Sequence, residues 1–142
     1  MTTRSQISGL AVGQTFETVV VEDLKRTQIV QYAGASGDYN PLHTDDRYAT
    51  TIAGYPSVFA HGMLTMGLTG QAVAALVGPD NLLRFGVRFT AQVWPGDTLT
   101  VRSTLARIEE TADGPVAELS VSTVNTEGAE VLSGYAHARL AG

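Results

Sequence analysis

The apolar stretch at residues 58–77 is the feature that most limits the folds open to this chain. It is apolar around its whole circumference at helical spacing, which is typical of a helix enclosed by protein rather than one lying on a surface. Gly62, Gly67 and Gly70 would let other backbone approach it closely. The stretch is short for a bilayer and is interrupted by threonine, glycine and glutamine. We therefore interpret it as a buried central helix.

After this helix the apolar residues change to a period of two, which predicts strands. Apolar and polar residues alternate along residues 84–93, with Arg84 and Arg88 on the polar face. Turn residues separate three further predicted strands, near residues 98–108, 116–125 and 129–140. Before the central helix we expect a first strand at residues 16–22 and a helix at about residues 25–36 that Gly37 ends. Antiparallel strands around one buried helix predict an α+β fold.

Residues 32–49, YAGASGDYNPLHTDDRYA, predict a bent loop that brings an acid and a base together. On a continuous helix Asp38 and His43 would point about 140° apart. Pro41 removes a backbone donor, and Asn40 is pushed toward an extended conformation because it precedes a proline. The two titratable side chains are therefore free to converge.

The end of this loop predicts a short helix that reaches about residue 50. Thr44 is the expected N-cap, and Asp45 and Asp46 fall in the first turn, where acids are favourable. Capping accounts for both acids. A metal site made of these two acids with Asp38 and His43 is therefore not expected.

The loop resembles the signature of the MaoC-like family of (R)-specific enoyl-thioester hydratases and dehydratases. That signature is an aromatic residue, then S-G-D-x-N-P-L-H, then five residues and a small one, which Tyr32, residues 36–43 and Ala49 match. A second hallmark, H-G-M at the start of an apolar helix, is present at residues 61–63, and residues 87–99 are similar to the strand and turn that follow it. The resemblance implies the hot-dog fold, a curled antiparallel sheet around one long helix, as a single domain over residues 1–142.

The resemblance also implies three catalytic residues, Asp38, His43 and Gly62. Hydration of a double bond next to a thioester needs a base and an acid at one point, which Asp38 and His43 can supply. Which of the two moves which proton stays open. Backbone N–H groups at a helix start are unpaired donors at the positive end of the macrodipole, so Gly62 is the expected donor to the enolate-like oxygen.

Five further residues are predicted to bind or orient the substrate: Asn40, His61, Tyr55, Phe59 and Arg88. Asn40 is expected to shape the turn and to anchor the acid and the base, and His61 to be structural or to line the substrate. The loop with Tyr55 and Phe59 either lines an acyl tunnel or closes the core. Arg84 and Arg88 are candidates to meet the phosphates of coenzyme A or of a carrier-protein pantetheine arm, although exposed arginines on a strand are common.

These features predict reversible hydration of trans-2-enoyl thioesters to (R)-3-hydroxyacyl thioesters in fatty-acid or related acyl metabolism. The resemblance implies no metal or redox cofactor, and coenzyme A or the pantetheine arm of an acyl carrier is expected as part of the substrate. One alternative is a hot-dog thioesterase; against it, residues 57–77 contain no Asp or Glu, where one branch of those enzymes places its carboxylate. The other is a non-catalytic acyl-binding subunit of a heteromeric dehydratase, which the complete Asp38 and His43 pair disfavours.

Composition narrows the partners and the compartment. The chain has no cysteine, so it has no disulfide and no thiolate nucleophile. Its net charge of −5, without a basic stripe, makes it a poor nucleic-acid binder. No apolar run of the signal-peptide kind begins the sequence, so we expect a cytoplasmic protein with no membrane association. A sheet edge and an apolar helix flank predict a homodimer, or a heterodimer with a paralogous subunit, and an acyl carrier protein is one candidate partner.

Overall fold

The structure is a computed structural model that describes residues 6–140. Its main elements are β1 (Thr15–Val21), α1 (Arg26–Ser36), α2 (Gly62–Val77), β2 (Leu82–Phe89), β3 (Leu99–Thr111), β4 (Gly114–Val124) and β5 (Glu130–Arg139). Short helical turns join them: η1 (Gln6–Gly9), η2 (Pro41–His43), η3 (Tyr48–Ile52) and η4 (Pro79–Asn81). This is the order of strand, helices and strands that the sequence predicts.

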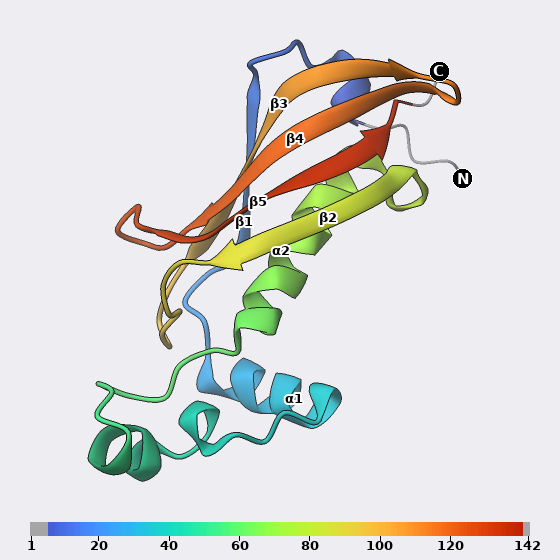
Figure 1. The fold of residues 1–142 in the computed structure, drawn as a ribbon. Helices are drawn as coiled ribbons and strands as arrows, with labels where there is room; N and C mark the ends of the chain where they lie inside the picture. Colours follow the sequence, from blue (N-terminus) through green and yellow to red (C-terminus); the bar gives the residue numbers. More distant parts are fainter. Residues whose placement is uncertain (1–5, 141–142) are drawn as a thin grey trace.

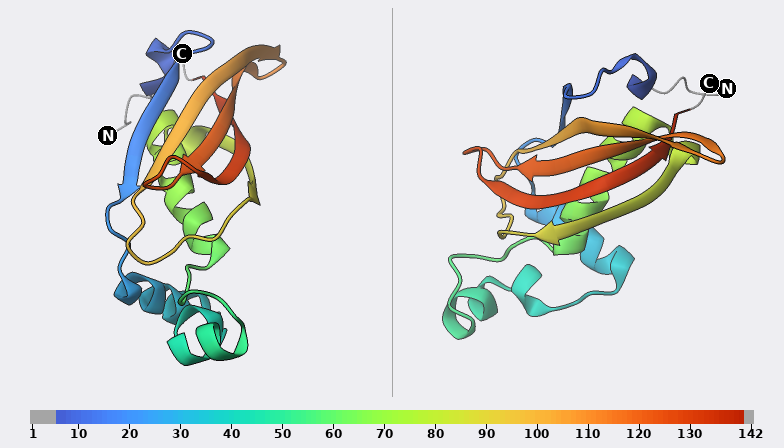
Figure 2. Two further views of the ribbon diagram at one scale, coloured as in Figure 1. Left: turned by 90° about the vertical axis from the view of Figure 1, so that its left-hand side faces the viewer. Right: turned by 45° about the horizontal axis from the view of Figure 1, so that its top comes forward.

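The strands form one antiparallel sheet that curls over α2 (Figures 1 and 2). Their order across the sheet is β1-β3-β4-β5-β2, so β1 and β2 are its edges. Alternate side chains of the inner face, such as Val101, Leu119 and Ala136, are buried in one core with Val73 and Leu76 of α2. The arrangement confirms the predicted α+β hot-dog fold.

Helix α2 is shorter and less enclosed than the sequence predicts. It begins at Gly62 rather than at residue 58, because the preceding residues run extended: the Ala60 N–H donates to Val93 O at 2.8 Å, and His61 has φ −59° and ψ 137°. One flank of the helix is buried, but Met63 on the other is 55% exposed. No helix within residues 6–140 has both the length and the apolar character needed to cross a membrane.

A smaller helical layer, residues 26–52, lies below the sheet at the N-terminal end of α2 (Figure 1); we call it the overhang. Helix α1 ends at Gly37 as predicted, where φ is +77° and the Gly37 N–H donates to Ala33 O. The predicted short helix capped by Thr44 is wrong in detail. Thr44 is the C-cap of η2, so it is not available to the next element, and Asp45 Oδ1 accepts the N–H of Tyr48 instead. That next element, η3, is a single π-helical turn.

Strand β2 also ends earlier than its period-two pattern predicts. The pattern continues to residue 93, but the strand stops at Phe89 because the N–H groups of Thr90 and Ala91 both turn toward Val131 O, at 2.9 and 3.4 Å. Val93 is nevertheless buried and bonds to Ala60. The chain therefore leaves the sheet edge and passes beside the start of α2.

Candidate active site

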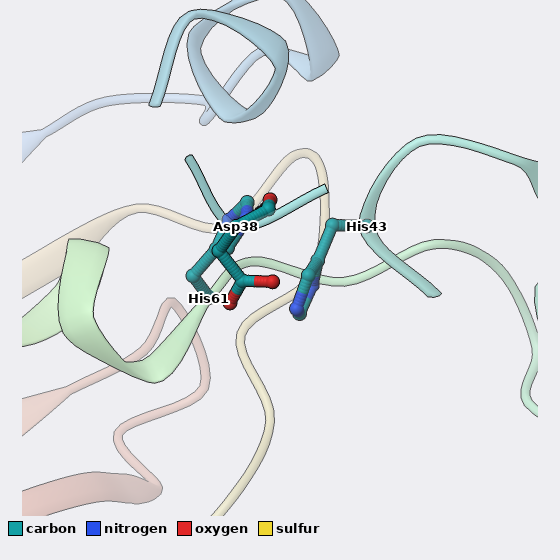
Figure 3. A group of neighbouring side chains, drawn as sticks. All are labelled: Asp38, His43 and His61. Atoms are coloured by element: carbon teal, nitrogen blue, oxygen red, sulfur yellow. Dashed lines mark hydrogen bonds between the residues drawn. The ribbon is translucent and has the colours of Figure 1, made fainter. Parts of the chain in front are cut away.

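Asp38, His43 and His61 come together where the overhang meets the start of α2 (Figure 3). Asp38 follows α1, His43 ends η2 and His61 is the N-cap of α2. Each offers one polar atom to a group whose atoms all lie within 4.8 Å of one another. The bend at Asn40 and Pro41 thus brings the predicted acid and base together, and it adds His61 to them.

Asp38 shapes its own loop through one carboxyl oxygen and leaves the other free. Its N–H donates to Ser36 Oγ and its Oδ1 accepts the N–H of Asn40, both at 3.2 Å. Within residues 6–140 its Oδ2 has no hydrogen-bond partner, and the side chain is exposed. Loop capping and proton exchange are therefore compatible, because they use different oxygens.

His43 directs Nε2 at the group because Nδ1 is already engaged. Nδ1 lies 2.7 Å from Phe59 O, and since a carbonyl oxygen can only accept, Nδ1 carries the hydrogen. In the neutral and the charged form alike, Nε2 is then the nitrogen that gains or loses a proton. The ring is 9% exposed and meets Phe59 edge-on.

His61 contacts both members of the predicted pair. Its Nε2 lies 3.0 Å from Asp38 O, so Nε2 carries a hydrogen and donates it to that carbonyl. Its ring stacks on His43 with centroids 3.8 Å apart, and the ring of Tyr32 meets it edge-on. The other nitrogen, Nδ1, is buried without a hydrogen-bond partner in the described part of the chain. A buried unsatisfied acceptor costs about 1–3 kcal/mol.

The stacked rings are poorly arranged for a metal ion, although three ligand types meet here. A ring nitrogen binds a metal through a lone pair that lies in the plane of the ring, at about 2.0–2.1 Å for zinc. The planes of His43 and His61 are inclined by only 25°, so their lone pairs run side by side rather than converge on one point.

A cavity of about 370 Å³ adjoins this group at the start of α2, lined by Phe59, Ala60, Gly62, Thr65, Phe89, Thr90, Ala91, Gln92, Val93 and Val131. Gly62 is the first residue of the helix, so its N–H has no partner within the helix. A Cβ at Gly62 would lie 3.2 Å from the ring of Phe89. Asp38, His43 and His61 do not line the cavity; it lies beside them, and the backbone of Phe59 and Gly62 connects the two.

The remaining residues that the sequence predicts for substrate binding lie at different places relative to Asp38 and His43. Asn40 Oδ1 accepts the N–H of Leu42 at 3.0 Å, so its side chain caps η2. Phe59 lines the cavity, and Tyr55 packs edge-on against it at 4.9 Å. Arg88 is not brought to the site: it lines a trough on the outer face of the sheet with residues of β4 and β5. The parts of these residues in substrate binding stay predictions.

Asp46 ties the overhang to the segment that leads into α2. Its Oδ2 accepts from the Arg26 guanidinium at 2.7 Å, and its Oδ1 accepts the N–H of Val58 at 3.2 Å. The hydrogen bond from Arg26, and then that from Val58, lowers the pKa of the Asp46 carboxyl. Both charged side chains are about half exposed, so the pair adds little stability by itself. The carboxylate is directed at these partners and not at Asp38.

Sequence reasoning missed two aromatic contacts that fix the site. Trp94 packs edge-on against Phe59, at 5.7 Å between centroids, and thereby supports the residue whose carbonyl holds His43. Phe89 covers the start of α2. The chain has one tryptophan, and its place just before the Pro95-Gly96 turn was a usable signal for a fixed position beside the helix start.

This chain matches one family model and several proteins named as hydratases or dehydratases. The family model described as MaoC like domain matches residues 8–126. The 3-hydroxyacyl-thioester dehydratase Y of Mycobacterium tuberculosis is 44% identical over 68 residues, which cover 46% of this chain and 23% of that protein. The peroxisomal enoyl-CoA hydratase 2 of Arabidopsis thaliana is 38% identical over 85 residues, 58% of this chain and 27% of that protein. This chain thus spans about a quarter of the length of these two relatives.

Two solved structures are similar over nearly the whole chain. An (R)-hydratase from A. caviae involved in PHA biosynthesis superimposes with a TM-score of 0.78 at 26% identity, covering 94% of this chain and 98% of that one. An R-hydratase from Pseudomonas aeruginosa in the unliganded form gives 0.79 at 28% identity, covering 98% and 93%.

Proposed function

This chain belongs to the MaoC-like domain family, and from that membership we propose that it catalyses the reversible hydration of trans-2-enoyl thioesters to (R)-3-hydroxyacyl thioesters. The observation that carries the proposal is the meeting of Asp38 and His43 at the start of α2, where the Gly62 N–H has no partner within the helix. Relatives named as thioester dehydratase and as enoyl-CoA hydratase support the reaction class. Similarity to two (R)-hydratases supports the stereochemistry.

In the hydration direction the pair acts on one water molecule. The water oxygen bonds to C3 while one of its O–H bonds breaks, and the proton passes to the base of the pair. The C2=C3 electron pair moves toward the thioester oxygen, and C2 then takes a proton from the acid of the pair. Asp38 Oδ2 and His43 Nε2 are the atoms free to exchange these protons, and dehydration runs through the same steps in reverse.

The Gly62 N–H stabilises the negative charge that develops on the thioester oxygen. It lies at the positive end of the α2 macrodipole, where an unpaired donor favours an anion. A donor preorganised in this way is typically worth about 3 kcal/mol in the transition state. The cavity beside Gly62 is the expected approach of the thioester.

The reaction so proposed uses no metal or redox cofactor, because the proton transfers need only an acid and a base. Coenzyme A or the pantetheine arm of an acyl carrier protein is part of the substrate. Of the two alternatives, a thioesterase would release free thiol from an acyl thioester, and a non-catalytic subunit would bind the thioester without changing it. The convergence of Asp38 and His43 favours the hydratase.

Chiral analysis of the product tests the reaction and its stereochemistry together. The water, the pair and the Gly62 donor occupy fixed positions relative to the enoyl plane, so one enantiomer should dominate. We expect trans-2-enoyl-CoA esters to lose their conjugated chromophore and to give the (R)-3-hydroxyacyl product. A panel of acyl lengths identifies the preferred substrate. A product that is mainly (S) contradicts the proposal, as does release of thiol without loss of the enoyl group.

The chain pairs with a second subunit, either another copy or a paralogue. Strand β2 is a sheet edge, and its Leu83 and Phe89 are 45% and 50% exposed. Met63 leaves a flank of α2 equally open. Open sheet edges and apolar flanks usually need a partner. Sedimentation at micromolar concentration should give a dimer; a fully active monomer contradicts the pairing.

A further inference from the structure

His61 has a buried acceptor whose partner is not part of the described chain. Because Nε2–H is committed to Asp38 O, neutral His61 carries its lone pair on Nδ1. That atom is shielded from solvent and accepts no hydrogen bond from residues 6–140. A lone pair in this position is satisfied only by a hydrogen that reaches the interior, on an internal water or on a ligand.

The contacts of His61 with its neighbours use the ring and only one of its two nitrogens. The edge contact with Tyr32 and the stack on His43 need only a flat ring, and the bond to the Asp38 carbonyl needs only a donor. None of these three contacts uses Nδ1. A neutral imidazole that donates through Nε2 has an acceptor at Nδ1, so this nitrogen is left for a further partner.

The position of the His61 ring indicates which chemical group binds to its Nδ1. His61 stacks directly on His43, the proposed proton carrier, and it immediately precedes Gly62, the proposed donor to the thioester oxygen (Figure 3). In the proposed reaction the thioester oxygen binds at Gly62 and the oxygen added at C3 reacts next to His43. That second oxygen belongs to water before hydration and to a hydroxyl group after it. Only one hydrogen of the attacking water goes to the base. The other stays on the product oxygen and needs an acceptor that does not remove it.

We propose that His61 Nδ1 is this acceptor: it binds the O–H hydrogen of the attacking water and, in the product, that of the 3-hydroxyl group. The proposal rests on the proposed hydratase function and adds a third side chain to the site. His61 then recognises the hydroxyl group through Nδ1, while its Nε2 keeps the hydrogen bond to Asp38 O. No bond to His61 forms or breaks, since the hydrogen stays on oxygen.

Two amide substitutions separate the two nitrogens of His61. In His61→Gln the amide N–H₂ reaches the position of Nε2 and keeps the donor to Asp38 O, while the acceptor at the position of Nδ1 is lost. In His61→Asn the amide oxygen takes the position of Nδ1, and the donor to Asp38 O is lost. Each variant thus keeps one contact and removes the other, and both remove the ring that stacks on His43.

The assay is hydration of the shortest enoyl-CoA that the wild type accepts. In this assay we compare the inhibition constants of two coenzyme A esters of the same acyl length. One inhibitor is the saturated acyl-CoA, without a hydroxyl, and the other is the (R)-3-hydroxyacyl-CoA product. For His61→Gln we expect inhibition by the saturated ester close to wild type and a thermal stability above that of His61→Asn. Inhibition by the hydroxy ester should weaken, and turnover should fall, by about tenfold or more each. His61→Asn should unfold at lower temperature yet keep the preference for the hydroxy ester.

A His61→Gln variant with the wild-type preference and turnover overturns the proposal. So does an equal loss of the preference in both variants, which would mean that the stacked ring and not Nδ1 is what matters. Failure of the proposed function is seen earlier and separately, because the wild type would then hydrate no enoyl-CoA of any length.

Discussion

Replacing Asp38 by Asn or His43 by Gln should lower the turnover number for hydration of enoyl thioesters by about 10² to 10⁴. Both changes keep a polar side chain of similar size but remove the ability to exchange a proton at neutral pH. Asp38→Asn also keeps an Oδ1 that can accept the Asn40 N–H, so the turn should survive. Turnover followed by loss of the conjugated enoyl chromophore, together with circular dichroism of each variant, checks the expectation.

The hydrogen bond from His43 Nδ1 to Phe59 O requires a second variant at this position. Glutamine does not place a donor where Nδ1 lies, so His43→Gln loses that bond as well as the base. His43→Asn keeps an N–H at the position of Nδ1 and lacks any group at that of Nε2. If proton exchange at Nε2 is what counts, the two variants should be equally impaired. Recovery of activity in His43→Asn would mean that the ring serves only to hold the loop.

The double variant tests whether the two residues act as one unit. Because they serve the same water, Asp38→Asn with His43→Gln should be little slower than the poorer single variant. Binding of a saturated acyl-CoA should persist in all of them, since the thioester is held elsewhere. A non-catalytic subunit would lose nothing measurable in any variant. Full hydratase activity in both folded single variants places the chemistry at other residues.

The sequence predicts those parts of this fold that depend on local chemistry. The αL termination at Gly37 and the bend at Asn40 and Pro41 follow from backbone preferences over a few residues, and both are found. The strands follow from alternation on a half-buried sheet. The same alternation places Arg88 on the face opposite Phe89, and in the structure the two residues line different pockets.

The sequence does not predict what depends on contacts between distant segments. Helix α2 starts late because Ala60 bonds to Val93, a residue 33 positions further along the chain. The stack of His61 on His43 likewise joins separate segments, because the overhang is bonded to the segment before α2 by the Val58 N–H to Asp46 Oδ1 and by His43 Nδ1 to Phe59 O. No local pattern contains these distances. The sequence predicts that Asp38 and His43 converge, but the contact of His61 with both is visible only in the folded chain.

Replacing Gly62 by Pro should lower turnover by about 10² or more, because it deletes the N–H proposed to bind the thioester oxygen. The backbone accommodates this change: Pro is tolerated at the first position of a helix, and His61 already has the extended ψ of 137° that a residue before proline adopts. Loss of activity in a folded variant would then report the missing donor rather than a broken helix.

Gly62→Ala is the matched control for this substitution. It keeps the N–H but introduces the same Cβ, which would meet the Phe89 ring at 3.2 Å. Phe89 is half exposed, so it has room to move by the few tenths of an ångström required. The alanine variant should thus lose far less turnover than the proline variant when both are assayed on the same enoyl-CoA. Equal turnover in the two would assign the oxyanion donor to another group, such as the Met63 N–H, the next amide of α2 without an intrahelical partner.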